Sequence, residues 1–225
     1  MFEALILAGG KGTRLKSVTG DIPKPMVNVN GSPFLYRLMR RLESQGCKRI
    51  VLSLGYQSDY IVEKVKADRP VACDVEFVIE KTPLGTGGAI KLASRHIIDD
   101  RFLVLNGDTY CEIDYAQFIE YSKDFDLTIS GVFVDEVDRY GVLNIDCSYN
   151  VVGMNEKSSS GGGVINSGIY VLKKSDIINY HLDSFSFEVD FIPEFKGIFK
   201  ASVSTDLFID IGIPRDYIKA CSIIK

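Results

Sequence analysis

The chain begins with a short apolar run that passes directly into a glycine-rich loop, Phe2-Glu3-Ala4-Leu5-Ile6-Leu7-Ala8-Gly9-Gly10-Lys11-Gly12-Thr13-Arg14-Leu15. Phe2–Ala8 has the length and composition of a buried strand. Glycines that follow a strand let the backbone approach a ligand closely and turn its N–H groups toward anionic oxygens. This stretch therefore predicts a first strand that ends in an anion-binding loop.

Two standard nucleotide-binding loops are excluded by the same residues. A dinucleotide fingerprint requires a third glycine where Leu15 stands, and a Walker loop ends in Gly-Lys-Ser/Thr, which is absent here. A plain tight turn remains an alternative for the glycines taken alone. The loop, however, continues into Pro23-Lys24-Pro25, whose prolines restrict the backbone on both sides of Lys24. A fixed lysine together with Arg14 suits a triphosphate, whereas a solvated surface lysine is the alternative.

The first half of the chain alternates strand and helix patterns, which is typical of a mostly parallel sheet covered on both faces. Asp108 follows the most apolar run, which we place at the sheet centre, so it lies where open α/β sheets bind ligands. The predicted elements are the strands Phe2–Ala8, Arg49–Leu54, Val75–Glu80 and Phe102–Leu105, and helices that begin at Ser32-Pro33, at Ser58-Asp59, at Gly88 (to Ile97) and at Asp114 (to Lys123).

The second half changes to short strands with turns, which predicts antiparallel structure beside the main sheet. The predicted strands are Asp126–Val134, Gly141–Asp146, Val151–Asn155, Val164–Leu172 and one near Leu207–Ile211, with helices around Phe187–Phe195 and from Pro214 onward. We interpret Ser158–Gly163 as a flexible hairpin turn, because it is too short to separate two domains.

Composition excludes several classes of protein. The chain has 225 residues, a net charge of −4 and 46% hydrophobic residues, which excludes intrinsic disorder, collagen and a polycationic nucleic-acid binder. Its two histidines, His96 and His181, make a zinc site or a histidine-dependent triad improbable. The five scattered cysteines indicate free thiols in a reducing compartment. Without a long apolar segment or signal peptide, the sequence predicts a cytoplasmic protein with no nucleic-acid or membrane partner.

Seven blocks in order along the chain resemble the sugar-1-phosphate nucleotidyltransferases. They are Gly9–Leu15 with Pro23-Lys24-Pro25, Glu80–Ala89, Leu105–Thr109, Arg139–Val142, Glu156-Lys157, Ile165–Tyr170 and Ile209–Gly212. The resemblance covers nearly the whole chain. It implies one domain over residues 1–225, a Rossmann-like three-layer α/β/α sandwich with a mixed, mostly parallel central sheet and a small antiparallel sugar-binding subregion. Residues 1–125 would mainly bind nucleotide, and residues 126–225 the sugar phosphate.

The resemblance also implies roles for individual residues of the nucleotide site. Arg14, Lys24 and Asp108 would be catalytic, with Arg14 and Lys24 neutralising the α-phosphate and the leaving pyrophosphate. Asp108 and Asp210 would hold Mg²⁺, since carboxylate oxygens suit a cation that also takes phosphate oxygens. Capping or turn formation is the alternative role for either aspartate. The nucleotide-binding residues would be Leu7, Ala8, Gly9, Gly10, Gly12, Thr13, Arg14, Lys24, Gly85, Thr86 and Asp108.

A second set of residues would bind the sugar phosphate. Glu156 and Asn166 would contact hydroxyls and Lys157 the phosphate, although a carboxylate beside a lysine is also a common structural ion pair. The whole set is Gly107, Gly141, Glu156, Lys157 and Asn166.

The reaction that the resemblance implies is in-line attack of a sugar 1-phosphate oxygen on the α-phosphorus of a nucleoside triphosphate. The substrates that we expect are GTP and D-glycero-α-D-manno-heptose 1-phosphate, which would give GDP-heptose and pyrophosphate. Mannose 1-phosphate guanylyl transfer and uridylyl or cytidylyl transfer remain alternatives, as does a catalytically inactive nucleotide-sugar sensor. Monomer and homodimer are both open.

Overall fold

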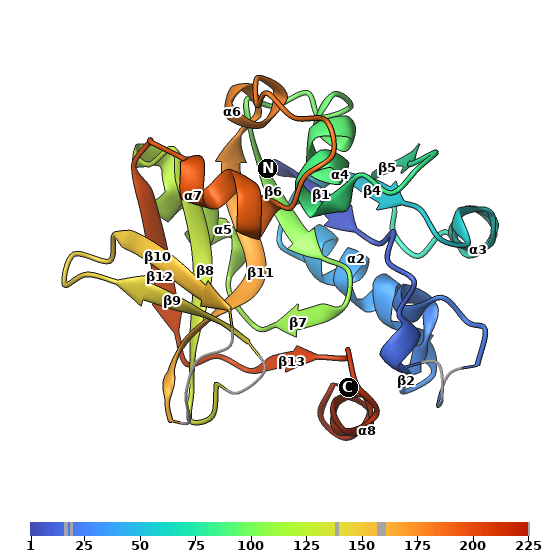
Figure 1. Ribbon diagram of the computed structural model, residues 1–225. Helices are drawn as coiled ribbons and strands as arrows, with labels where there is room; N and C mark the ends of the chain where they lie inside the picture. The colour runs from blue at the N-terminus through green and yellow to red at the C-terminus, as the bar shows by residue number, and fades with distance from the viewer. Residues whose placement is uncertain (16–17, 19, 138–139, 157–160, 225) are drawn as a thin grey trace.

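Strand β1 (Phe2–Leu7) lies near the middle of a mixed nine-stranded sheet. The computed structural model describes residues 1–15, 18, 20–137, 140–156 and 161–224 (Figure 1). Its strands follow the order β10-β9-β11-β6-β1-β4-β5, and β8 pairs with both β11 and β12. Their bounds are β4 (Cys47–Leu54), β5 (Asp74–Ile79), β6 (Arg101–Asn106), β8 (Leu127–Val134), β9 (Gly141–Ile145), β10 (Val151–Glu156), β11 (Gly163–Lys173) and β12 (Phe199–Ser204).

The parallel part of the sheet brings three chain segments to one edge. Leu7 at the end of β1 pairs with Ser53 of β4 on one side and with Asn106 of β6 on the other. Because these strands run in the same direction, the loops that follow them start side by side. This confirms the central position predicted for the 102–105 run and places the residue after Gly107 at the carboxyl edge.

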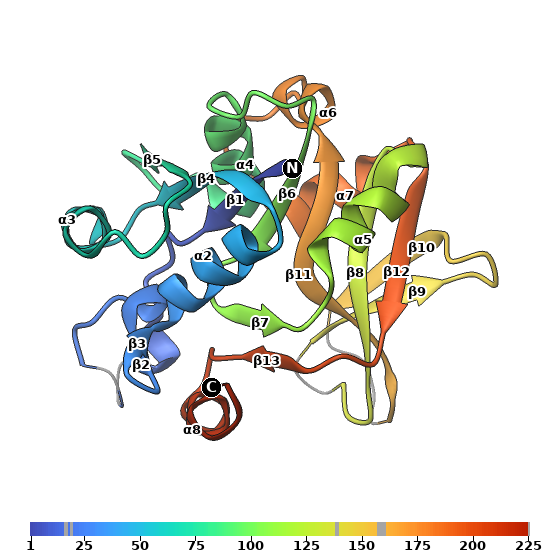
Figure 2. The ribbon, with the colours of Figure 1, turned by 180° about the vertical axis from the view of Figure 1, so that it is seen from behind.

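Helices cover both faces of this sheet, as Figures 1 and 2 show from opposite sides. Ala4 and Ile6 of β1 belong to a core cluster with helix α2 (Phe34–Ser44), whereas Leu5 belongs to a second cluster with helix α4 (Gly85–Ser94). Successive strand side chains point to opposite faces, so a strand buried on both sides has no polar alternation. The predicted three-layer α/β/α sandwich is confirmed.

The other helices complete these two layers. Helices α3 (Ser58–Asp68), α5 (Tyr115–Tyr121) and α8 (Pro214–Ile223) contribute to the α2 cluster, and α6 (Lys174–Ile178) and α7 (Ile192–Glu194) to the α4 cluster. Asp114 caps α5 by accepting a hydrogen bond from the Gln117 N–H at 2.9 Å. Among the described residues, no helix combines the length and apolar character needed to cross a membrane.

The second half of the chain supplies the antiparallel part. Strand β11 runs antiparallel to β6, β8 and β9, while β12 pairs parallel with β8. Both halves of the chain thus join in one continuous sheet. A separate pair, β7 (Thr109–Cys111) and β13 (Phe208–Asp210), lies across the carboxyl edge, and the short β2 (Asn28–Val29) and β3 (Ser32–Pro33) form a third sheet.

Several helix boundaries differ from the sequence predictions. The helix predicted from Gly88 to Ile97 begins at Gly85 and ends at Ser94, because turn hydrogen bonds replace the helix at residues 96 and 97. Ser32 does not cap α2, since it belongs to β3, and α3 starts without a side-chain cap after a left-handed Gln57. Ser32 and Ser58 therefore match the sequence pattern of a helix cap, but neither side chain makes the capping hydrogen bond.

The predicted helix at residues 187–195 is two shorter pieces. A π-helical turn, η4 (Phe187–Phe191), is followed by the single turn of α7. Pro193 in α7 lacks an N–H group, which limits regular helix there. The sequence analysis missed α6 and β12, whose apolar patterns are short. Of the predicted 158–163 turn, residues 158–160 lie outside the described residues, and β11 begins at Gly163.

Candidate active site

A cleft of about 740 Å³ opens at the carboxyl edge of the parallel strands. The loops after β1, β4 and β6 and the start of α4 line it. It brings together every residue predicted to bind nucleotide and one predicted to bind the sugar phosphate: Leu7, Ala8, Gly9, Gly10, Gly12, Thr13, Arg14, Lys24, Gly85, Thr86, Gly107 and Asp108. Residues 100 positions apart in sequence meet here because parallel strands end on the same edge.

The glycine loop passes very close to the lysine segment. Gly12 has a φ of +58°, and a Cβ at this position would lie 2.7 Å from the Cβ of Lys24. Only glycine combines this left-handed conformation with such a close approach. Arg14 follows in the 3₁₀ turn η1 (Thr13–Leu15), which the buried Leu15 anchors to the core. The loop thus carries an arginine to the wall of the cleft.

Lys24 is held at the opposite end of the same loop. Its segment forms a 3₁₀ turn, η2 (Lys24–Met26), closed by the Met26 N–H donating to the Pro23 carbonyl at 2.8 Å. This turn holds the backbone of Lys24 in addition to the restriction by the two prolines. The Lys24 ammonium lies 2.5 Å from Asp108 Oδ2 and 3.7 Å from Asp210 Oδ1. Only 13% of the lysine side chain is exposed.

Asp210 reaches this position through the pairing of β13 with β7, in which Asp210 stands opposite Thr109. The two aspartates therefore converge on one cation position, at which the Lys24 ammonium lies. Two carboxylates that converge beside an open cleft match the donor set that Mg²⁺ takes together with phosphate oxygens. Within the described ranges, no group of three or more histidine, cysteine, aspartate or glutamate side chains is arranged to hold a metal by itself.

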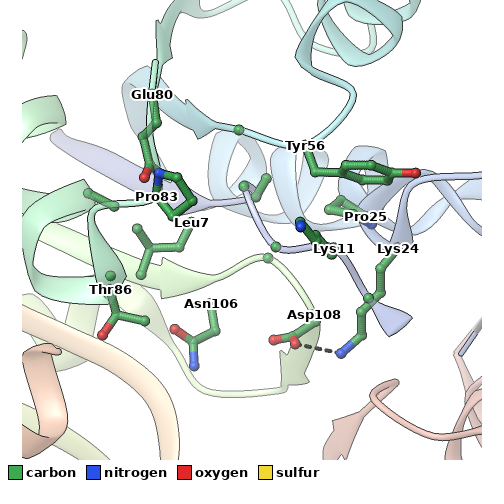
Figure 3. A pocket seen from close by; sticks show the side chains of 18 of the residues that line it. Leu7, Lys11, Lys24, Pro25, Tyr56, Glu80, Pro83, Thr86, Asn106 and Asp108 are labelled. Atoms are coloured by element: carbon green, nitrogen blue, oxygen red, sulfur yellow. Dashed lines mark hydrogen bonds and ion pairs between the residues drawn. The ribbon is translucent and has the colours of Figure 1, made fainter. Parts of the chain in front are cut away.

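The other end of the cleft has a different chemistry. Leu7, Pro83 and the half-buried Glu80 lie there, away from the Lys24–Asp108 pair (Figure 3). Burial raises the pKa of the Glu80 carboxyl above its ordinary value, and the Leu84 N–H, which donates to Oε2 at 3.0 Å, partly offsets that effect. The cleft thus has Arg14 and Lys24 at one end, together with the aspartates that pair with Lys24, and the Glu80 carboxylate beside apolar groups at the other.

The start of α4 is tied to the second half of the chain. Gly85 has a φ of +74°, and a Cβ there would lie 2.4 Å from the Phe185 carbonyl oxygen. That carbonyl accepts from the N–H groups of Gly87 and Gly88 at 3.0 and 3.3 Å. The Thr86 hydroxyl donates to Glu188 Oε2 at 2.7 Å. Glycine at position 85 therefore allows the helix start to pack directly on this segment.

The residues predicted to bind the sugar phosphate are only partly brought together. Gly107 lines the cleft, whereas Gly141 begins β9 and Asn166 lies on β11, where its Nδ2 donates to the Tyr170 hydroxyl at 2.6 Å. Lys157 lies outside the described residues, as does the side chain of Glu156 at the end of β10.

The sequence analysis gave no role to eleven other residues that line the cleft: Lys11, Pro25, Gly55, Tyr56, Glu80, Lys81, Thr82, Pro83, Ala89, Asn106 and Gly212. Gly55 and Tyr56 directly follow the buried strand β4, so the strand-end rule that placed Asp108 would have found them. Glu80 likewise follows β5. Gly212 ends the Ile209–Gly212 block of the resemblance, which gave it no role, and the pairing of β13 with β7 brings it to the cleft.

Together, the fold and the cleft define an α/β protein whose cleft, lined by a glycine-rich loop, an arginine and a lysine, opens at the carboxyl edge of its sheet. The model of the nucleotidyl transferase family matches residues 3–223. The chain is 39% identical over 217 residues to the D-glycero-α-D-manno-heptose 1-phosphate guanylyltransferase of Campylobacter jejuni, covering 96% of each chain. It is 38% identical to the enzyme of that name from Aneurinibacillus thermoaerophilus, covering 97% and 96%.

A solved structure agrees with these relatives. HddC from Yersinia pseudotuberculosis is 59% identical and superimposes with a TM-score of 0.95 over 100% of both chains. The same protein in complex with GMP-PN gives a TM-score of 0.94. The chain belongs to the nucleotidyl transferase family.

Proposed function

We propose that this protein transfers a guanylyl group from GTP to D-glycero-α-D-manno-heptose 1-phosphate, giving GDP-heptose and pyrophosphate. The observation that carries the proposal is the polarity of the cleft, with cations at one end and an acceptor-only carboxylate at the other. The names of the two curated relatives and the guanine nucleotide in the HddC complex support the same pair of substrates.

The two ends of the cleft orient the triphosphate. Its phosphates belong beside Arg14 and Lys24, where ammonium and guanidinium groups neutralise charge and the loop N–H groups add further donors. The base then extends toward the apolar end, between Leu7 and Pro83. Backbone groups of residues 7–10 and of Gly85-Thr86 would hold it, as the sequence analysis expects.

Glu80 supplies a reason for the choice of guanine. Guanine presents two adjacent donors, N1–H and the N2 amino group, whereas uracil and thymine present an N–H between two acceptors. An ionised carboxylate accepts hydrogen bonds and donates none. It therefore matches guanine with both of its oxygens and meets a repulsive carbonyl in uracil or thymine. Burial strengthens this preference for guanine, because a polar group without a hydrogen-bond partner costs more free energy away from water.

Asp108 and Asp210 would hold Mg²⁺, whose charge supplies additional stabilisation of the phosphate oxygens. The residues of the chain do the remaining work by positioning. A sugar 1-phosphate is already anionic at neutral pH, so its oxygen attacks the α-phosphorus in line without a general base. Lys24, placed by its two proline neighbours, stabilises the charge that develops on the leaving pyrophosphate together with Arg14.

The acceptor would lie toward β9, β10 and β11, which carry Gly141, Glu156 and Asn166 respectively, with Lys157 contributing to its phosphate. The five cysteines are all free thiols, which fits a protein of a reducing compartment such as the cytoplasm.

A substrate matrix tests the proposal. Five nucleoside triphosphates are each combined with D-glycero-α-D-manno-heptose 1-phosphate, mannose 1-phosphate and glucose 1-phosphate, and pyrophosphate release is measured with Mg²⁺. We expect the highest kcat/KM for GTP with the heptose phosphate. Turnover of UTP, CTP or dTTP without turnover of GTP would overturn the choice of base, and binding of nucleotide sugars without any turnover would identify a sensor.

A further inference from the structure

A chain of four side chains connects the nucleotide cleft to β11, and its central member, Glu188, has no role in the proposed function. Glu188 Oε2 accepts from the Thr86 hydroxyl at 2.7 Å, and Oε1 accepts from the Tyr170 hydroxyl at 3.2 Å. The Tyr170 oxygen in turn accepts from Asn166 Nδ2 at 2.6 Å. Thr86 lines the cleft, and Asn166 is an expected acceptor-site residue, so the chain spans both substrate regions.

The carboxylate fixes the direction of every hydrogen bond on the Tyr170 side. It has no proton to donate, so the Tyr170 hydroxyl must donate to it. The phenol oxygen is then left only as an acceptor, and Asn166 must turn its NH₂ group toward it. Burial and the adjacent Glu188 raise the pKa of Tyr170 well above its ordinary value, which keeps this donor protonated.

The backbone confirms this orientation of Asn166 from the other side. The Gly168 N–H donates to Asn166 Oδ1 at 2.8 Å, which requires the carbonyl oxygen at that position. One lone pair of Asn166 Oδ1 remains for a ligand, and the second Nδ2 hydrogen makes only a weak bond to the Met154 thioether sulfur at 3.7 Å, which a sugar hydroxyl could replace. The same logic holds for Thr86, whose oxygen accepts from the Phe187 N–H at 2.8 Å because its proton is committed to Glu188.

The segment that carries Glu188 is rigidly anchored. Phe187, on one side, is buried edge-to-face on Tyr170 with ring centroids 4.9 Å apart, and it stacks on Phe191 at 5.0 Å. These two rings flank the π-helical turn, a feature that frequently marks functional positions. The preceding loop is fixed by Lys91, which is 8% exposed and donates to the Tyr180 carbonyl at 2.8 Å.

We propose that Glu188 is a positioning residue for the acceptor sugar: acting through Tyr170, it fixes which face of the Asn166 amide a sugar hydroxyl meets. This inference rests on the proposed function and adds to it. Asn166 then offers an acceptor lone pair and a donor held only weakly by Met154, both in fixed places, an arrangement that selects a hydroxyl of matching position and orientation. The bond to Thr86 ties that arrangement to the nucleotide loop.

A double-mutant cycle tests the proposal. Glu188→Gln leaves only one carbonyl oxygen for the Thr86 and Tyr170 hydroxyls, so the Tyr170 proton is no longer fixed and its bond from Asn166 weakens, whereas Tyr170→Phe removes that bond. Loss of one such hydrogen bond corresponds to roughly fivefold in KM for the heptose phosphate. We expect this increase in each single variant, a smaller change in KM for GTP, and no further increase when the two substitutions are combined. Glu194→Gln, on the exposed next turn, is the matched control and leaves both KM values unchanged.

A second readout needs no substrate. In the ligand-free protein, the side-chain amide protons of Asn166 should exchange slowly with solvent in ¹⁵N NMR spectra. Exchange should accelerate in Glu188→Gln and not in Glu194→Gln. An unchanged exchange rate and amide shift in Glu188→Gln would overturn the proposal.

The two measurements separate the possible failures. Additive effects on the acceptor KM would mean that Glu188 does not act through Tyr170 and would also overturn the proposal. A wild-type protein that does not turn over any acceptor would instead contradict the proposed function, while the exchange measurement still decides whether Glu188 orients Asn166.

Discussion

Replacing Glu80 by glutamine should change the base preference of the enzyme. Glu80 Oε2 accepts from the Leu84 N–H at 3.0 Å, while Oε1 lies toward Gly9, where an added Cβ would be 3.1 Å away. In Glu80→Gln the amide oxygen keeps the bond to Leu84, so the NH₂ group takes the other position. A donor then faces the N1–H donor of guanine, and a charge-assisted hydrogen bond is lost.

The size of the effect follows from that geometry. Hydrogen bonds to charged groups contribute about 1.5–3 kcal/mol, and an unpaired buried donor costs a similar amount. We therefore expect kcat/KM for GTP to fall by roughly 10–100-fold. The kcat/KM for UTP should fall little or should rise, because the O4 carbonyl of uracil accepts a hydrogen bond from the new NH₂ group. The ratio of the two kcat/KM values should thus shift toward UTP by at least about tenfold.

The assay measures pyrophosphate release with GTP and with UTP at a saturating concentration of the heptose phosphate. Glu120→Gln, which removes an exposed carboxylate paired with Lys123, is the matched control. Because burial raises the pKa of Glu80, the wild-type kcat/KM for GTP should decrease on acidification at a pH above the ordinary range of a glutamate, and the variant should lack this decrease. An unchanged GTP-to-UTP ratio in Glu80→Gln would refute the reasoning and leave base choice to the backbone.

Three further outcomes test other parts of the site and the fold. Arg14→Ala should lower kcat by roughly 10²–10³, the scale of one lost charge-stabilising donor, and unchanged turnover would contradict its role. Asp210→Ala should raise the Mg²⁺ concentration needed for half-maximal activity, so a metal titration identical to wild type would remove it from the metal site. Iodoacetamide at pH 8 should label the exposed Cys147 of the native protein first. Burial raises the pKa of the Cys47 and Cys111 thiols to about 12, so these two should react slowly. Mass spectrometry that finds Cys47 and Cys111 modified first would contradict the buried core.

Much of the fold was predictable from local patterns. Apolar runs of strand length separated by helical periodicity predicted β1, β4, β5 and β6 with their connecting helices, because burial on both faces favours apolar residues in inner strands such as β1 and β6. Boundaries were less predictable. The start of α4 depends on the Phe185 carbonyl, which is distant in sequence, and the π-helical turn at residues 187–191 depends on aromatic packing rather than on propensity.

The residues of the candidate site likewise include some that local sequence patterns predict and some that they do not. Residues that directly follow a parallel strand, such as Gly9 and Asp108, could be placed because the strand itself carries them to the edge. Gly55 and Tyr56 obey the same rule and were overlooked. The orientation of Glu80 and the bond between Thr86 and Glu188 had no local signal, since both depend on how loops pack after the sheet has formed.

The sequence by itself therefore determined an α/β sheet, a glycine-rich loop after its first strand and a lysine held between prolines, since each depends on neighbouring residues and backbone geometry. Only the tertiary structure decided that Asp210 meets Asp108 at the Lys24 ammonium, that a carboxylate lies at the far end of the cleft, and that Glu188 joins the two substrate regions. Most of these contacts join residues far apart in sequence, such as Lys24 and Asp108, 84 positions apart, and Thr86 and Glu188, 102 positions apart. Their partners are chosen by strand pairing and core packing, which no local pattern encodes.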